Sequence, residues 1–155
     1  MKKLLLAALI ATSCNVQAAK AVRVFVKNWP QMQAFQAEGY CLLEGNSFCA
    51  YPIYEVPLGY RAVIENVSVR GRVESGKRLL GTVSTSVNDT MVRHYLDSSE
   101  VAEGDTSRVL SVGQETKIYA DPNTLILVTG GINDGVATSS SYMRMSISGY
   151  LEELK

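Results

Sequence analysis

Apolar and polar residues alternate along most of this chain, in short runs. The clearest runs cover residues 60–69 and 79–87. Successive side chains of a β-strand point to opposite faces, so a period of two predicts strands rather than helices. Valine and isoleucine, frequent in both runs, also fit a pleated surface better than a helix. Ser75 and Gly76 lie between the runs and predict a hairpin turn.

The rest of the chain repeats this pattern. Further strands are predicted over residues 21–27, 33–43, 91–96, 115–120, 124–129 and 141–151. The run TLILVT at 124–129 is continuously apolar, which predicts a strand buried on both faces. We therefore expect an all-β fold, an antiparallel β-sandwich of jelly-roll type, with a closed β-barrel as the alternative.

The N-terminus has the pattern of a signal peptide covering residues 1–18. Two lysines precede an apolar run at 4–11, and Val-Gln-Ala at 16–18 suits cleavage after Ala18. The run is too short for a membrane-spanning helix, which needs about 20 residues. We expect residues 19–155 to form one exported domain, periplasmic or secreted. Cys14 supports the alternative of a lipoprotein anchored through that residue.

Removal of the signal peptide leaves Cys41 and Cys49 as the cysteines of the mature chain. An even pair in an exported protein predicts a disulfide. These two cysteines and the single histidine, His94, do not supply a four-ligand metal site. His94 shares a strand face with Val92 and Leu96, so we expect a partly buried structural histidine.

Charge and motifs exclude several classes of function. Fifteen Lys and Arg residues balance 15 Asp and Glu residues, for a formal net charge of zero. Nucleic acids and anionic lipids attract strongly basic surfaces, so neither is an expected partner. No G-x-S-x-G motif or other catalytic pattern occurs. We therefore expect a protein that is not an enzyme and carries no cofactor.

Three residues are candidates for ligand contact. Trp29 lies beside a proline outside the strand pattern, and an indole suits carbohydrate or protein contact. Asn133 and Asp134 lie in the glycine-rich loop 130–140, where their side chains could bind sugar hydroxyls. The acidic loop 97–107 could offer oxygen ligands to calcium, but it lacks the spacing of an EF-hand, so a solvated loop is expected.

Four segments in fixed order carry a resemblance to a known group of proteins. They are AFQAEGYC, IYEVPLGYRAVIENVSV, KIYADPNT and SISGYL. In these segments the chain resembles a family of small exported bacterial β-sandwich proteins of unknown function. The resemblance implies export and a single sandwich domain. It implies no activity, cofactor or catalytic residue.

Two functions fit these expectations. The first is an exported binding module that recognises a glycan, an envelope component or a protein. The alternative is a structural or assembly protein of the cell envelope that forms homo-oligomers through a strand edge or an apolar sheet face. The predicted strand 21–27, with Val22, Val24, Phe25 and Val26, would suit such an edge, because an unpaired strand can accept another chain.

Overall fold

The computed structural model describes residues 32–43, 45–103, 107–137 and 141–154. These residues form eight β-strands and no helix: β1 (Gln33–Leu42), β2 (Phe48–Glu55), β3 (Tyr60–Val73), β4 (Leu79–Val87), β5 (Thr90–Tyr95), β6 (Arg108–Ala120), β7 (Leu125–Ile132) and β8 (Tyr142–Glu153). The predicted signal peptide and the predicted strand 21–27 lie outside the described residues. Within them, no helix is long and apolar enough to span a membrane.

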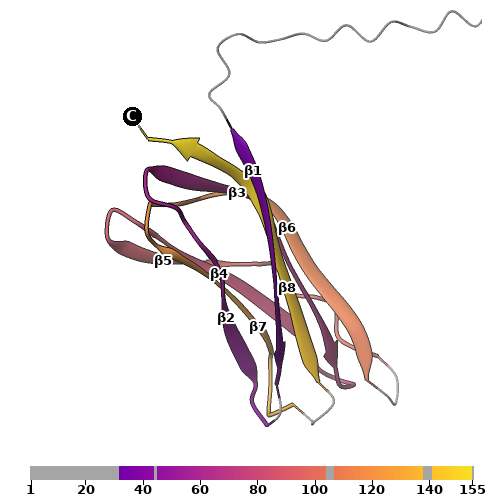
Figure 1. The fold of residues 1–155 in the computed structure, drawn as a ribbon. Coiled ribbons are helices and arrows are strands. Elements are labelled where there is room, and N and C mark those ends of the chain that lie inside the picture. The colour runs from indigo at the N-terminus through magenta and orange to yellow at the C-terminus, as the bar shows by residue number, and fades with distance from the viewer. Residues whose placement is uncertain (1–31, 44, 104–106, 138–140, 155) are drawn as a thin grey trace, which may run out of the picture.

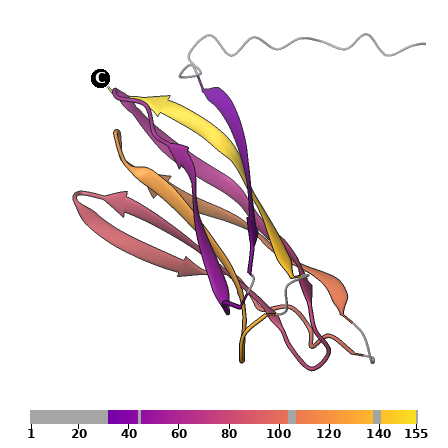
Figure 2. The same cartoon turned by 60° about the horizontal axis from the view of Figure 1, so that its bottom comes forward.

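The strands form two antiparallel sheets, seen as two layers in Figure 1. Sheet A has the order β1-β8-β3-β6, and sheet B has the order β2-β7-β4-β5. The all-β prediction is confirmed. The closed barrel is wrong, because each sheet ends in two edge strands instead of continuing into the other. Figure 2 shows the β4–β5 hairpin (pink) at one edge of sheet B.

The core lies between the inner faces of the two sheets. The two sheets approach each other closely, because a Cβ added to Gly130 of β7 would come within 2.9 Å of Val69 in β3. In β8 the predicted alternation is confirmed, because Met143, Met145 and Ile147 are buried while the residues between them face outward. The largest fully buried side chains come from both sheets and include Ile64, Leu79, Val83, Ile126, Met143 and Met145.

A β-bulge in β3 explains why neither face of its sequence is purely apolar. Ile64 pairs with Gly149 of β8, and Asn66 pairs with the next residue, Ser148, so Glu65 is the extra residue. The bulge reverses which positions face inward. Ala62 and Ile64 before it, and Val67 and Val69 after it, are therefore all buried.

The predicted hairpin between residues 60–69 and 79–87 is wrong. β3 pairs with β6 and β8, whereas β4 pairs with β5 and β7, so the chain crosses between sheets at this turn. A Ser-Gly turn reverses the chain equally well within a sheet or between sheets. The hairpin is instead β4–β5, where Asn88 and Asp89 have φ of 50° and 58°. Two consecutive positive φ angles suit the two-residue turn of a twisted hairpin.

The prediction that residues 124–129 are buried on both faces is also wrong. Ile126 and Val128 of β7 are buried, but Leu125 is 51% exposed and Leu127 is half-buried. The strand is central in sheet B, yet no described segment covers the outer face of that sheet. Its outward residues Leu125 and Leu127 belong to an outer face with several exposed apolar side chains, which is described below.

The sandwich is closed along the side where β1 and β2 run. The Phe35 and Tyr54 rings stack with centroids 4.6 Å apart, and burial raises the pKa of the Tyr54 phenol. The Tyr51 ring packs against Gly39, where any Cβ would collide with it.

Cys41 and Cys49 are at disulfide distance as predicted, with 6.6 Å between Cα atoms. The bridge therefore links the edge strand of sheet A to the edge strand of sheet B.

Candidate functional site

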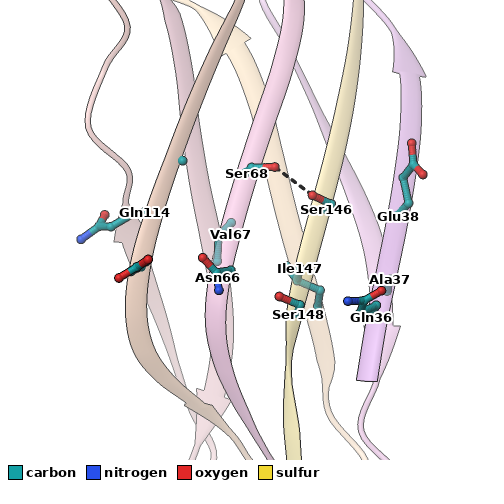
Figure 3. Close-up of a pocket in the computed structure, with 12 residues that line it drawn as sticks. Gln36, Ala37, Glu38, Asn66, Val67, Ser68, Gln114, Ser146, Ile147 and Ser148 are labelled. Atoms are coloured by element: carbon teal, nitrogen blue, oxygen red, sulfur yellow. Dashed lines mark hydrogen bonds between the residues drawn. The ribbon is translucent and has the colours of Figure 1, made fainter. Parts of the chain in front are cut away.

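A groove of about 660 Å³ hollows the outer face of sheet A and crosses all four of its strands (Figure 3). Its lining is dominated by hydroxyl, amide and carboxylate side chains. The outward-facing lining residues are Gln36 and Glu38 of β1, Ser146 and Ser148 of β8, Asn66 and Ser68 of β3, and Gly113 and Glu115 of β6.

Strand register gathers these residues into two rows across the sheet. The first row is Gln36, Ser148, Asn66 and Glu115, and the second is Glu38, Ser146, Ser68 and Gly113. In both rows the central strands β8 and β3 carry short side chains, while the edge strand β1 carries long ones. The groove is therefore bounded by long side chains at the β1 edge and by Glu115 at the β6 edge, and it is open toward Gly113.

The bulge at Glu65 also builds the site. Without the extra residue, Asn66 would lie on the same side of the strand as Ile64 and would point into the core. With it, Asn66 faces outward between Ser148 and Glu115. Bulges are frequent beside functional sites because they redirect a side chain in this way.

Two serines meet at the centre of the groove. Ser68 Oγ and Ser146 Oγ lie 2.8 Å apart across β3 and β8, a distance at which either hydroxyl can donate to the other (Figure 3). A hydroxyl has one donor and two acceptor lone pairs. The pair therefore keeps one O–H donor and several lone pairs to offer a ligand, on central strands that are hydrogen-bonded on both sides.

Two arginines lie beside the groove, in a neighbouring hollow that shares Glu38, Ser68 and Ser146 with it. Arg70 of β3 and Arg144 of β8 are directly paired across the strands, and neither forms an ion pair with any described residue. Like charges opposite each other destabilise a sheet. Beyond them, Arg72 lies 5.8 Å from the Tyr142 ring, which in turn stacks on Tyr40. A cationic and aromatic patch therefore extends the polar groove.

The predicted contact residues are not in the groove. Trp29 lies outside the described residues. Asn133 and Asp134 lie in the β7–β8 connection, where the Asn133 Oδ1 accepts a 2.6 Å hydrogen bond from the backbone N–H of Arg78. The Lys77 Nζ donates to the carbonyl of Val136 in the same connection, at 3.1 Å. These contacts tie the loop to the β3–β4 turn, which is a structural role for Asn133. A ligand role for the three residues stays a prediction.

The acidic loop is partly anchored to the sandwich. The Ser99 Oγ accepts a 2.9 Å hydrogen bond from the N–H of Leu79, and the N–H of Ala102 donates to the carbonyl of Lys77. Ala102 is buried, so residues 97–103 do not form the wholly solvated loop that was expected. The described residues contain no group of three His, Cys, Asp or Glu side chains placed to hold a metal ion.

His94 lies on the inward-facing side of β5 with Val92, and Leu96, directly after the strand, is buried. His94 is half-buried and faces a cavity between the sheets rather than the groove. The histidine therefore adds no acid or base to the groove.

Comparisons with known proteins give no family for this chain. No protein-family model matches it, and neither does any curated protein. The groove itself is therefore the basis on which a function is inferred.

Proposed function

We propose that this protein is an exported, non-enzymatic binding module whose groove on sheet A binds a glycan. The observation that carries the proposal is the double row of hydroxyl and amide side chains across the outer face of sheet A. Sugar hydroxyls both donate and accept hydrogen bonds, as do the side chains of serine, asparagine and glutamine. The volume of about 660 Å³ suits a short oligosaccharide segment, since ligand sites are commonly about 300–1,000 Å³.

Jelly-roll connectivity is part of this proposal. Along the chain, each strand lies in the opposite sheet from the one before it, except at the β4–β5 hairpin. The strand orders β1-β8-β3-β6 and β2-β7-β4-β5 support two interlocked Greek keys, the arrangement of a jelly roll. Lectin domains are among the proteins that use this architecture. The fold is compatible with many functions, so the groove remains the main support.

The placement of carboxylates favours binding over hydrolysis. Glu38 is on β1 and Glu115 is on β6, at opposite edges of sheet A. Three inter-strand spacings of about 4.8 Å separate their backbones by about 14 Å. Glycosidases place their two carboxyl groups only about 5–9.5 Å apart. These two groups therefore suit hydrogen bonds at the rim of the groove rather than paired acid and base chemistry.

A glycan array followed by calorimetry tests the groove. We expect saturable binding of at least one polysaccharide, weakened at least about tenfold by the double variant S68A/S146A, because both central hydroxyls are lost. S86A is the matched control, because Ser86 is a half-buried serine pointing outward from sheet B. Binding that is equally strong in S68A/S146A, or a silent array at millimolar protein, would contradict the proposal.

Export is also proposed, and the disulfide supports it, because such bridges persist in oxidising compartments. Intact mass on protein recovered from the periplasm or medium tests this. We expect a chain that begins at Ala19 and weighs two hydrogen atoms less than its reduced form. A diacylglyceryl mass on Cys14 would support the lipoprotein alternative instead of the soluble exported form. Two titratable thiols would contradict the disulfide.

The second candidate function is self-association, and one observation favours it. The outer face of sheet B exposes large apolar side chains on all four strands. They are Phe48, Leu80, Met91, Tyr95 and Leu125. Polar residues such as Thr82, Ser86 and Arg93 lie between them on the same face. Large exposed apolar side chains on every strand of one sheet are typical of an interaction site. A second copy of this chain is the partner we propose for it, as in the envelope assembly protein considered from the sequence.

A further inference from the structure

Two arginines project from the outer face of sheet A without a partner for their charge. Arg70 of β3 and Arg144 of β8 are directly opposite each other in the register, both are exposed, and neither forms an ion pair with any described residue. They line a hollow of about 270 Å³ that shares Glu38, Ser68 and Ser146 with the groove. Because like charges in directly opposite positions destabilise a sheet, an anion bound between the two arginines would offset their repulsion.

The nearest carboxylate of the hollow does not supply that anion. Glu38 is on β1 opposite Ser146, whereas Arg144 is opposite Tyr40, so the glutamate lies one outward position away from the arginine pair. No ion pair joins Glu38 to either arginine in the described part of the chain. The counter-charge of the arginines can therefore come from a ligand.

An exposed aromatic ring lies next to the arginine pair. Tyr40 of β1 is paired with Arg144 in the register and is 50% exposed. Its ring stacks on Tyr142 with centroids 6.1 Å apart, and the guanidinium of Arg72 lies 5.8 Å from the centroid of the Tyr142 ring. The stack holds the Tyr40 ring in place, so its exposed surface can pack against the C–H face of a sugar.

We propose that the glycan bound in the groove carries a carboxylate, which Arg70 and Arg144 hold between them while an adjacent sugar ring packs on Tyr40. This inference rests on the proposed glycan-binding function and names the class of glycan, an acidic polysaccharide that contains uronic acids. A carboxylate has two oxygen atoms, and the planar guanidinium groups of two arginines can each bind one of them through charge-assisted hydrogen bonds.

The spacing along the strands indicates how the charges of this glycan are distributed. Ser68 and Arg70 are two positions apart on β3, a distance of about 7 Å along the strand, so one chain can contact the serine pair and the arginine pair together. Glu38 and Glu115 line the groove itself, where a second carboxylate would be repelled. Neutral sugars therefore suit the groove and a uronic acid suits the hollow, as in a glycan whose uronic acids are separated by neutral sugars.

Calorimetry with matched oligosaccharides tests the class of ligand. The acidic probes are tetrasaccharides of hyaluronate and of unsulfated chondroitin, in which glucuronate alternates with a neutral N-acetylated sugar. Each acid is compared with its methyl ester, which keeps the backbone and removes the charge. We expect at least one acid to bind saturably, and its ester to bind about threefold to tenfold more weakly, because exposed ion pairs contribute modestly to affinity.

Variants assign each contact by a different signature. R70Q/R144Q should weaken the acid to the level of its ester and leave the affinity for the ester unchanged, whereas arginines with a merely structural role would weaken both probes equally. Y40A should weaken acid and ester alike, by about threefold to tenfold, because packing on an aromatic ring does not depend on the charge. Y95A is the matched control, because Tyr95 is an exposed tyrosine on sheet B, and it should change neither affinity.

The outcomes separate this inference from the glycan-binding function on which it rests. Neutral glycans that bind and are weakened by S68A/S146A, while the acids bind no more tightly than their esters, would overturn the inference and keep the function. A preference for the acid that survives in R70Q/R144Q would also overturn the inference, because the carboxylate would then lie elsewhere. The absence of saturable binding of either acid at about 10 mM would overturn it whatever the neutral glycans do, and silence of every glycan would contradict the function as well.

Discussion

The outer faces of the two sheets are built on the same four-stranded antiparallel frame and differ sharply in chemistry. On sheet A, short polar side chains such as Ser68 and Ser146 lie at the centre of a hollow. On sheet B, Phe48, Met91 and Tyr95 are exposed by 63%, 64% and 74%. The inner faces, in contrast, are alike, because both contribute aliphatic residues to one core.

This contrast separates what folding requires from what it leaves open. Inward positions must be apolar and closely packed, since burial of apolar surface drives folding. Outward positions tolerate most substitutions with small changes in stability. Their composition therefore reflects what contacts each face. Paired hydroxyls and amides suit a hydroxyl-rich ligand, whereas exposed aromatic and aliphatic side chains suit another protein surface.

The largest effect is expected from filling the groove. Gly113 of β6 lies beside Ser68, and a Cβ there would meet the Ser68 Cβ at an ordinary 3.5 Å, so the backbone accepts a side chain. In G113L the isobutyl group would occupy the space above the central serines. We expect glycan affinity to fall by at least about a hundredfold, with a change in unfolding free energy within about 0.5 kcal/mol, as measured by calorimetry and urea denaturation.

S111L is the control for this variant. Ser111 is on the same strand and the same face, one outward position along, and pairs with Arg70. Ser111 does not line the groove, so the glycan affinity of S111L should stay within about twofold of that of the parent, a difference of about 0.4 kcal/mol. Equal loss in both variants would mean that binding depends on β6 in general rather than on the hollow.

The next largest effect concerns the apolar face of sheet B. We expect the protein to form a defined oligomer, and M91S/Y95S to weaken its association about tenfold or more, because two large apolar contacts are removed. Light scattering over a wide concentration range measures this. Glycan affinity per chain should not change, since neither residue lines the groove. A parent protein that stays monomeric throughout would remove self-association as a function.

The sequence pattern predicted the fold class well, for a definite physical reason. Alternation of side chains is a local property, so β8, with Met143, Met145 and Ile147 inward, could be predicted from its own residues. Which strands pair is a property of the whole chain. The local sequence of the Ser75–Gly76 turn therefore predicts a hairpin, although the turn joins two sheets.

The groove could not be predicted for the same reason. Its central residues, Ser68 and Ser146, are 78 positions apart in the chain, and each is an ordinary strand serine until register places them 2.8 Å apart. The bulge at Glu65, which turns Asn66 outward, leaves no recognisable signal in the sequence. Asn133 is a candidate from the sequence because loops often carry function. In the structure the Asn133 Oδ1 accepts a hydrogen bond from the backbone N–H of Arg78.

The smallest expected effect tests the pair of arginines beside the groove. Arg70 and Arg144 face each other without an ion pair among the described residues, so we expect acidic glycans to bind about threefold to tenfold more tightly than neutral ones of the same backbone. R144Q should abolish this preference and reduce the salt dependence of acidic-glycan binding, while neutral-glycan affinity stays nearly constant.

R93Q is the matched control, because Arg93 is an outward-facing arginine on sheet B. A preference for acidic glycans that survives in both R144Q and R70Q would show that these arginines do not contact the ligand. Relief of like-charge repulsion should also make R144Q slightly more stable than the parent, a change of about 0.2–1 kcal/mol in urea denaturation.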